Sequence, residues 1–250
     1  RILLTMTISE RARLRRFPVV TAVVFAVTTA VNLLQFAVPD TLGDLQRTPA
    51  GLHGEWWRSV TSLFVQDGGV AGTVSNLLFL LLVGAVAEQV LSPSRWLSQY
   101  FGVGVVCEFV SYAWQPIGGG NSIAVCGLAG AAALALWRAD ARLPGWAVQV
   151  LLLWCGCMIG TLWSGALIPA IVACVAASAL VRAGEERGVA VHRAAALVVP
   201  VVGVVLSIAE NIHGAALLLG CALAMSAARA RRPVSRTATD SHSIERSSAA

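Results

Sequence analysis

Eight apolar segments, each close to the length needed to cross a lipid bilayer, dominate this sequence of 250 residues. A helix crosses the hydrocarbon core with about 20 apolar residues. The segments occupy residues 17–38, 70–91, 96–115, 122–138, 146–163, 165–182, 194–209 and 211–228. Because a backbone inside a bilayer must satisfy its own hydrogen bonds, such segments become helices. The sequence therefore predicts an all-α polytopic membrane protein with about eight transmembrane helices.

Charge is scarce and unevenly placed. Only 12% of the residues are charged, against about 25% in soluble domains, which excludes a water-soluble enzyme. The 18 basic residues form clusters beside apolar segments rather than one basic stripe, so we expect the lipid bilayer and no nucleic acid as a partner.

The arginine clusters also predict the topology. Cytoplasmic loops of membrane proteins are enriched in basic residues, and eight crossings place most arginines on the side of the two termini. We therefore expect a multi-pass protein of the cell membrane with both termini in the cytoplasm. Its expected parts are a cytoplasmic segment (1–16), a transmembrane domain (17–228) and a disordered cytoplasmic tail (229–250).

Three consecutive glycines and an asparagine precede Ser122, the first residue of an apolar segment. The backbone N–H groups at a helix start have no partner within the helix. They are suited to binding the oxyanion that forms when a serine attacks a carbonyl group. The alternative reading is that Ser122 only caps its helix.

His213 is the one histidine of the sequence that lies within a predicted membrane segment. A titratable side chain is costly inside a bilayer and is a functional candidate for that reason. In the predicted topology the segments that begin near Ser122 and His213 both run from outside to inside, which places the two residues at one depth. Small residues, Gly127 and Gly130 on one helix and Gly220 on the other, allow these helices to pack closely.

The order of these features resembles the rhomboid family of intramembrane serine proteases. The residues that carry the resemblance are Glu55-Trp56-Trp57-Arg58, Thr61-Ser62-Leu63-Phe64, Asn76, Gly84 with Glu88, Ser122 ahead of Gly127, Gly130 and Ala131, and His213 with Gly220. The resemblance as a whole covers about residues 18–228.

This resemblance implies a rhomboid-like bundle, with a six-helix core and an extra hairpin, that cleaves transmembrane segments of membrane proteins with a Ser–His dyad. Ser122 is then the nucleophile and His213 the base, while Asn76 and the Ser122 backbone N–H hold the oxyanion. Trp57, Arg58, Glu88, Gly127, Gly130 and Gly220 form the structural motif. A dyad of this kind needs neither a metal nor a cofactor.

The sequence also departs from the family pattern. Ile123 stands in place of a glycine after the nucleophile, Gly72 in place of an oxyanion-binding histidine, and Cys126 in place of an aromatic residue. These departures leave open a catalytically inactive rhomboid-like protein that binds transmembrane helices. A more remote alternative is a polytopic transporter that uses Glu108 and Glu210 as ion sites.

Overall fold

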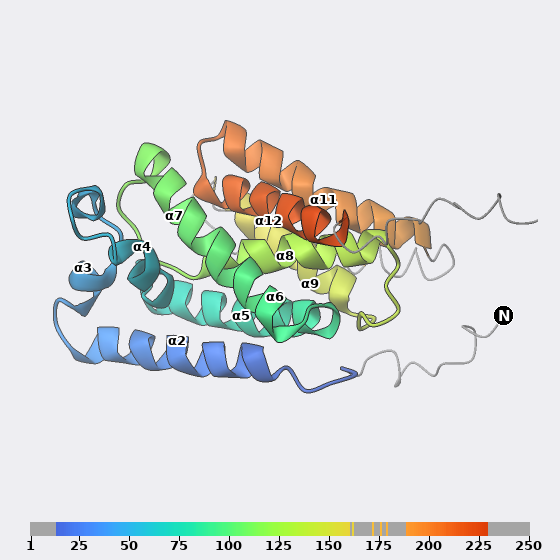
Figure 1. Cartoon of the computed structure of the whole chain (residues 1–250), viewed down its shortest axis with the longest axis horizontal. Helices are drawn as coiled ribbons and strands as arrows, with labels where there is room; N and C mark the ends of the chain where they lie inside the picture. The colour runs from blue at the N-terminus through green and yellow to red at the C-terminus, as the bar shows by residue number, and fades with distance from the viewer. Residues whose placement is uncertain are drawn as a thin grey trace, which may run out of the picture.

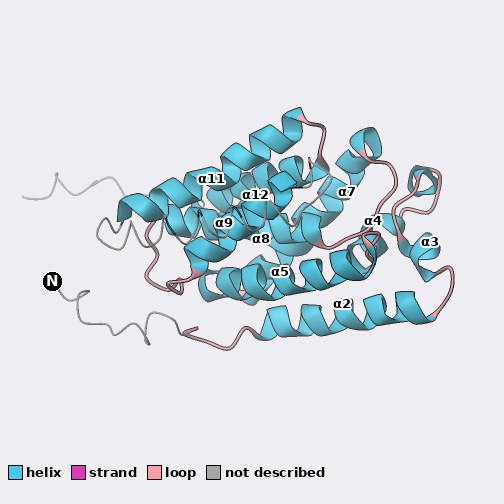
Figure 2. Cartoon of the chain, turned by 180° about the vertical axis from the view of Figure 1, so that it is seen from behind, coloured by secondary structure: helices cyan, strands magenta, loops and turns pink. Residues whose placement is uncertain are grey.

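The computed structural model describes residues 14–160, 162, 172, 176, 179 and 189–229 of the chain. Every regular element in this part of the chain is a helix, as Figure 2 shows. The main helices run alongside one another in a bundle (Figure 1). They are α2 (Val19–Ala37), α5 (Gly69–Val90), α8 (Ser122–Trp137), α9 (Ala147–Gly160), α11 (Val189–Ile208) and α12 (Ile212–Arg229).

A further long helical stretch follows α5 and is built of three pieces. These are α6 (Pro93–Leu97), the π-helical segment η4 (Ser98–Gly102) and α7 (Val103–Trp114). The loop between α2 and α5 holds four short helices, which are α3 (Thr41–Leu45), η2 (Pro49–Leu52), α4 (Arg58–Thr61) and η3 (Ser62–Phe64). This long first loop therefore has a defined structure at one end of the bundle.

Four helices in the described residues are long and apolar enough to cross a membrane, namely α2, α5, α11 and α12. The helices α8 and α9 are apolar but shorter. Every segment predicted from the sequence coincides with helix except 165–182, which lies outside the described residues apart from 172, 176 and 179. The number of crossings, six or eight, thus stays a prediction.

The predicted terminal parts also fall largely outside the described residues. Only residues 14–16 of the segment 1–16 and Arg229 of the tail 229–250 are described.

Helix α8 lies at the centre of the bundle. It packs against α5, α7, α11 and α12, and 14 of its 16 residues are buried. Its sequence is rich in alanine and glycine, which lets neighbouring helices approach from all sides. Sixteen residues span about 24 Å, less than the roughly 30 Å of a hydrocarbon core. Ser122, the first residue of this short helix, is itself buried.

Helices α11 and α12 form a tight hairpin (Figure 1). The turn between them, residues 209–211, places Glu210 in the left-handed region at φ 53°. A Cβ on Gly214 would collide with the backbone of Ser207 and Gly203. Glycine at this position therefore sets how closely α12 lies against α11.

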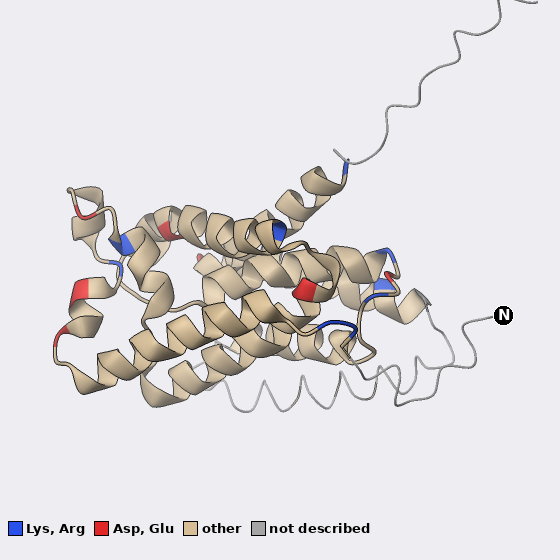
Figure 3. Ribbon diagram, turned by 60° about the horizontal axis from the view of Figure 1, so that its bottom comes forward, with Lys and Arg blue, Asp and Glu red and all other residues tan. Residues whose placement is uncertain are grey.

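Charged residues gather towards the two ends of the bundle (Figure 3). At one end the backbone N–H groups of Arg15 and Arg16 donate to Oε1 of Gln89 over 3.0 and 3.2 Å. At the same end the Arg193 guanidinium lies 5.6 Å from the ring centroid of Trp137. The first loop and Ser122 lie at the opposite end.

Candidate active site

The loop that leads to Ser122 is held by the first loop of the chain. The backbones of Gly118 and Arg47 exchange two hydrogen bonds of 2.8 and 3.1 Å, and Gly120 N–H donates to the carbonyl of Ser62 over 2.9 Å. A Cβ on Gly118 would lie 2.9 Å from the guanidinium of Arg47. The glycines therefore permit a close approach that fixes where α8 begins.

Ser122 and His213 are 91 residues apart in the sequence and meet through their side chains, with Oγ of Ser122 2.8 Å from Nε2 of His213. Ser122 is 9% exposed and His213, the second residue of α12, is half-buried. In this arrangement an imidazole can remove the hydroxyl proton while the oxygen attacks a carbonyl carbon. The structure brings together the two residues that the sequence marked as nucleophile and base.

The crossing of α8 and α12 sets this distance. A Cβ on Gly220 would lie 2.8 Å from both the Cα and the carbonyl oxygen of Gly127, and a Cβ on Gly130 would collide with the backbone of Gly220 and Cys221. All three predicted glycines therefore lie where the two helix backbones touch.

Gln99 reinforces the same crossing from the π-helical segment η4. Its buried Nε2 donates to the carbonyl of Gly127 over 3.0 Å and to that of Gly220 over 2.6 Å. One amide group thus binds both helices at the point where they cross. A π-helical segment changes the direction in which side chains leave the helix, and such segments are frequent near functional sites.

Asn76, the predicted side-chain donor for an oxyanion, lies half-buried on α5. Its Nδ2 donates to Oε1 of Gln66 over 2.8 Å. The same Nδ2 would be 3.2 Å from a Cβ on Gly120, two residues before Ser122. An amide nitrogen carries two protons, and the bond to Gln66 uses one of them.

Comparison with known proteins identifies the family of this chain. A family model described as "Rhomboid domain" matches residues 53–208, more than half of the chain. The chain belongs to the rhomboid family. The matched range includes Asn76 and Ser122 and ends before His213. With its membrane-length helices, this rhomboid chain is a multi-pass membrane protein.

One relative is the Bacillus subtilis (strain 168) protein named "Putative rhomboid protease YdcA". The two chains are 30% identical over 110 residues, which is 42% of this chain and 54% of the relative. The chain therefore spans about half the length of this curated relative. No solved structure gives a significant match.

Gln66 fills the space beside Gly72, where the rhomboid resemblance places a histidine. A Cβ on Gly72 would lie 2.7 Å from Nε2 of Gln66. Gln35 holds the backbone of Gln66 on both sides, because its Oε1 accepts from Gln66 N–H over 2.8 Å and its Nε2 donates to the Gln66 carbonyl over 2.7 Å. A second amide thus lies next to Asn76 in this rhomboid.

The Trp-Arg motif organises the first loop. The guanidinium of Arg58 donates to the carbonyls of Gly43 and Gln46 over 2.7 and 2.9 Å and pairs with Glu55. Trp57 remains 43% exposed beside Trp56. Arg58 therefore ties α3 to α4, while the tryptophan rings face outward.

Glu88 holds the start of α2. Its Oε1 accepts from Val20 N–H over 3.0 Å, and its Oε2 accepts from the N–H and the hydroxyl of Thr21, both over 2.8 Å. A carboxylate at a helix N-terminus accepts hydrogen bonds from the unpaired N–H groups there, and its negative charge is stabilised by the positive end of the helix dipole. Glu88 therefore joins α5 to α2 at the end of the bundle away from Ser122.

Glu108, considered from the sequence as an ion site, forms a buried ion pair. Its side chain is fully buried and pairs with Arg47, whose guanidinium also donates to the carbonyl of Gln115. Since Arg47 also pairs with the backbone of Gly118, this ion pair links α7 to the loop before Ser122. Glu210, the other residue considered, is exposed in the turn before α12.

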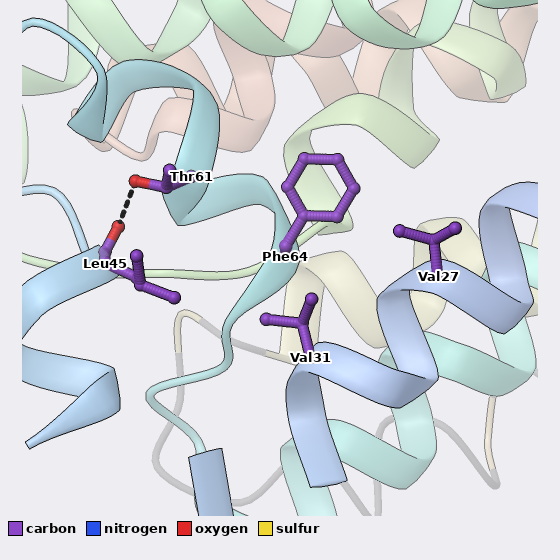
Figure 4. Close-up of a pocket in the computed structure, with 5 residues that line it drawn as sticks. All are labelled: Val27, Val31, Leu45, Thr61 and Phe64. Atoms are coloured by element: carbon purple, nitrogen blue, oxygen red, sulfur yellow. Dashed lines mark hydrogen bonds between the residues drawn. The ribbon is translucent and has the colours of Figure 1, made fainter. Parts of the chain in front are cut away.

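A shallow apolar hollow of about 230 Å³ lies apart from Ser122 and His213, between α2 and the first loop. Figure 4 shows its lining residues, Val27, Val31, Leu45, Thr61 and Phe64. The Thr61 hydroxyl donates to the carbonyl of Leu45 over 2.7 Å. No polar side chain of the candidate site lines this hollow.

Three sets of contacts at the site were not predicted. They are the 2.7 Å contact of Asn211 Oδ1 with His213 Nδ1 and the contacts of Gln66 and Gln99 described above. Asn211 had a readable signal, because an asparagine directly before an apolar helical segment is a favoured N-cap. The polar roles of Gln66 and Gln99 depend on contacts with distant helices, which local patterns do not encode. Among the described residues, no group of three histidine, cysteine, aspartate or glutamate side chains is arranged to hold a metal ion.

Proposed function

We propose that this rhomboid is an intramembrane serine protease that cleaves transmembrane segments of other membrane proteins. The observation that carries the proposal is the 2.8 Å approach of Ser122 Oγ to His213 Nε2 at the starts of α8 and α12. Family membership supports the same activity.

In the proposed reaction, Ser122 Oγ attacks the carbonyl carbon of the substrate peptide while His213 Nε2 takes the hydroxyl proton. Asn76 Nδ2 and the backbone N–H of Ser122 donate to the oxyanion that forms. His213 then gives its proton to the leaving nitrogen, and a water molecule hydrolyses the acyl-enzyme by the same route in reverse. The water and the peptide enter from the end of the bundle that carries the first loop.

The proposed topology places that end outside the cell and both termini in the cytoplasm of a cell-membrane protein. It is supported by the position of the arginines, since Arg15, Arg16 and Arg193 lie at the opposite end. Basic residues are retained on the cytoplasmic side of membrane proteins.

A fluorophosphonate probe tests the proposal directly, because it forms a covalent bond only with an activated serine. We expect the purified chain in detergent to be labelled and to cleave a model transmembrane substrate. Ser122→Ala and His213→Ala should lose both. The control is Ser111→Ala, since the Ser111 hydroxyl is buried and donates to the carbonyl of Cys107 in its own helix. Labelling that persists in Ser122→Ala, or none in the unaltered chain, would contradict the proposal.

A further inference from the structure

The imidazole of His213 is held on both of its nitrogens. While Nε2 faces Ser122 Oγ at 2.8 Å, Nδ1 lies 2.7 Å from Oδ1 of Asn211. An amide oxygen only accepts hydrogen bonds, so the proton of a neutral imidazole must reside on Nδ1. Nε2 then keeps its lone pair and is able to receive the hydroxyl proton of Ser122.

Asn211 is itself rigidly placed. It is 8% exposed, and its backbone N–H donates to the carbonyl of Leu206 over 2.9 Å. The next residue, Ile212, donates its N–H to Oε1 of Gln115 over 3.2 Å, which ties the turn to the loop before Ser122. The asparagine that faces the imidazole is therefore fixed by both α11 and the loop between α7 and α8.

We propose that Asn211 is a positioning residue that completes a Ser–His–Asn triad by fixing the tautomer and the ring orientation of His213. This inference rests on the proposed proteolytic function. When Ser122 Oγ bonds to the substrate carbonyl carbon, its proton moves to Nε2 and the imidazole becomes doubly protonated. The Nδ1–H group still donates to Asn211 Oδ1, which stabilises the positive ring until Nε2 gives its proton to the leaving nitrogen.

A purely structural role for Asn211 has to be separated from this one. Its Oδ1 also lies 3.1 Å from the backbone N–H of His213, as in an ordinary asparagine N-cap. Serine is an equally good N-cap, but its side chain is one bond shorter and does not extend to Nδ1. Aspartate both caps the helix and accepts from Nδ1. Asn211→Ser therefore keeps the helix cap and removes the contact with the ring, and Asn211→Asp retains both of these contacts.

The experiment compares these variants in the full chain in detergent. We expect Asn211→Ser to keep the Tm and helix content of the unaltered protein while kcat for a model transmembrane substrate falls at least about 10-fold with KM unchanged. Asn211→Asp should retain cleavage and fluorophosphonate labelling. Glu210→Gln, the matched control at the exposed residue before Asn211 in the same turn, should behave as the unaltered chain.

Nitrogen-15 NMR of the histidine rings supplies a readout that does not depend on activity. We expect the His213 signals to report a protonated Nδ1 and a bare Nε2 in the unaltered chain and in Asn211→Asp, and a mixture of tautomers in Asn211→Ser. The signals are assigned with His213→Ala.

Equal rates and equal tautomer populations in Asn211→Ser and the unaltered chain would overturn the inference and leave Asn211 as an N-cap only. If Asn211→Ser does not fold, loss of cleavage in a folded Asn211→Asp would overturn it as well. An unaltered chain that shows the Nδ1-protonated ring but no Ser122 labelling would instead contradict the proposed function.

Discussion

The backbone of Gly220 on α12 lies directly against the backbone of Gly127 on α8. The gap is so narrow that a Cβ on Gly220 would lie 2.8 Å from the Cα of Gly127. Because His213 lies two turns before Gly220 and Ser122 lies at the start of the helix that carries Gly127, this contact controls the distance between the two side chains. The separation of hydroxyl and imidazole is thus a property of helix packing as much as of the site itself.

Gly220→Ala should therefore weaken both the fold and the candidate site. An overpacked contact of this kind costs about 1–3 kcal/mol, because neither backbone has a flexible atom that can move aside. We expect a lower Tm in detergent and slower fluorophosphonate labelling of Ser122. Gly102→Ala is the matched control, since a Cβ there meets nothing within 4 Å. An unchanged Tm in Gly220→Ala would show that the helices separate easily.

Hydrophobic length and small-residue faces are local signals, so the sequence was sufficient to predict an all-helical protein and to single out Ser122 and His213, whose side chains lie 2.8 Å apart. It was not sufficient to predict that Gln66 lies beside Gly72, since Gln66 comes from the first loop and its place depends on Gln35 in α2. From the sequence, Glu108 was considered as an ion site. In the structure it pairs with Arg47, which lies 61 residues earlier in the chain. Polar partners supplied by distant parts of the chain leave no pattern in a single sequence.

Asn76→Ala should reduce catalysis without unfolding the protein. Removing one oxyanion donor typically lowers kcat about 10²- to 10³-fold, and Asn76 is half-buried and donates to Gln66 Oε1. We expect kcat for a model transmembrane substrate to fall while KM and Tm change little.

Asn32→Ala is the control for Asn76→Ala, because we expect it to lower the Tm and not kcat. The buried Nδ2 of Asn32 donates to the carbonyls of Thr28 and Phe64, so its loss should lower the Tm and leave kcat nearly intact. If Asn76→Ala changed the Tm and not kcat, Asn76 would be a structural residue and the oxyanion would need another donor.

Removal of one partner of the buried Arg47–Glu108 pair should strongly destabilise the protein. An uncompensated buried charge costs about 3–5 kcal/mol, and the two side chains are 4% and 0% exposed. We expect Arg47→Met to lower the free energy of unfolding by this amount and the double variant Arg47→Met, Glu108→Leu to recover much of it. The exposed pair of Arg142 and Asp140 is the control, since Arg142→Ala should cost at most about 1 kcal/mol. Similar losses in both single variants would contradict a buried role for Arg47.

Two single-cysteine substitutions should report opposite sides of the membrane. His53 is exposed in the first loop, at the end of the bundle with Ser122, and Arg142 is exposed in the turn between α8 and α9. Because the arginine-rich end is expected in the cytoplasm, a membrane-impermeant maleimide should label His53→Cys in intact cells and label Arg142→Cys only after permeabilisation. The unaltered chain, whose described cysteines are buried or half-buried, measures the background. Labelling of Arg142→Cys in intact cells with protection of His53→Cys would invert the topology, and the candidate site would then open towards the cytoplasm.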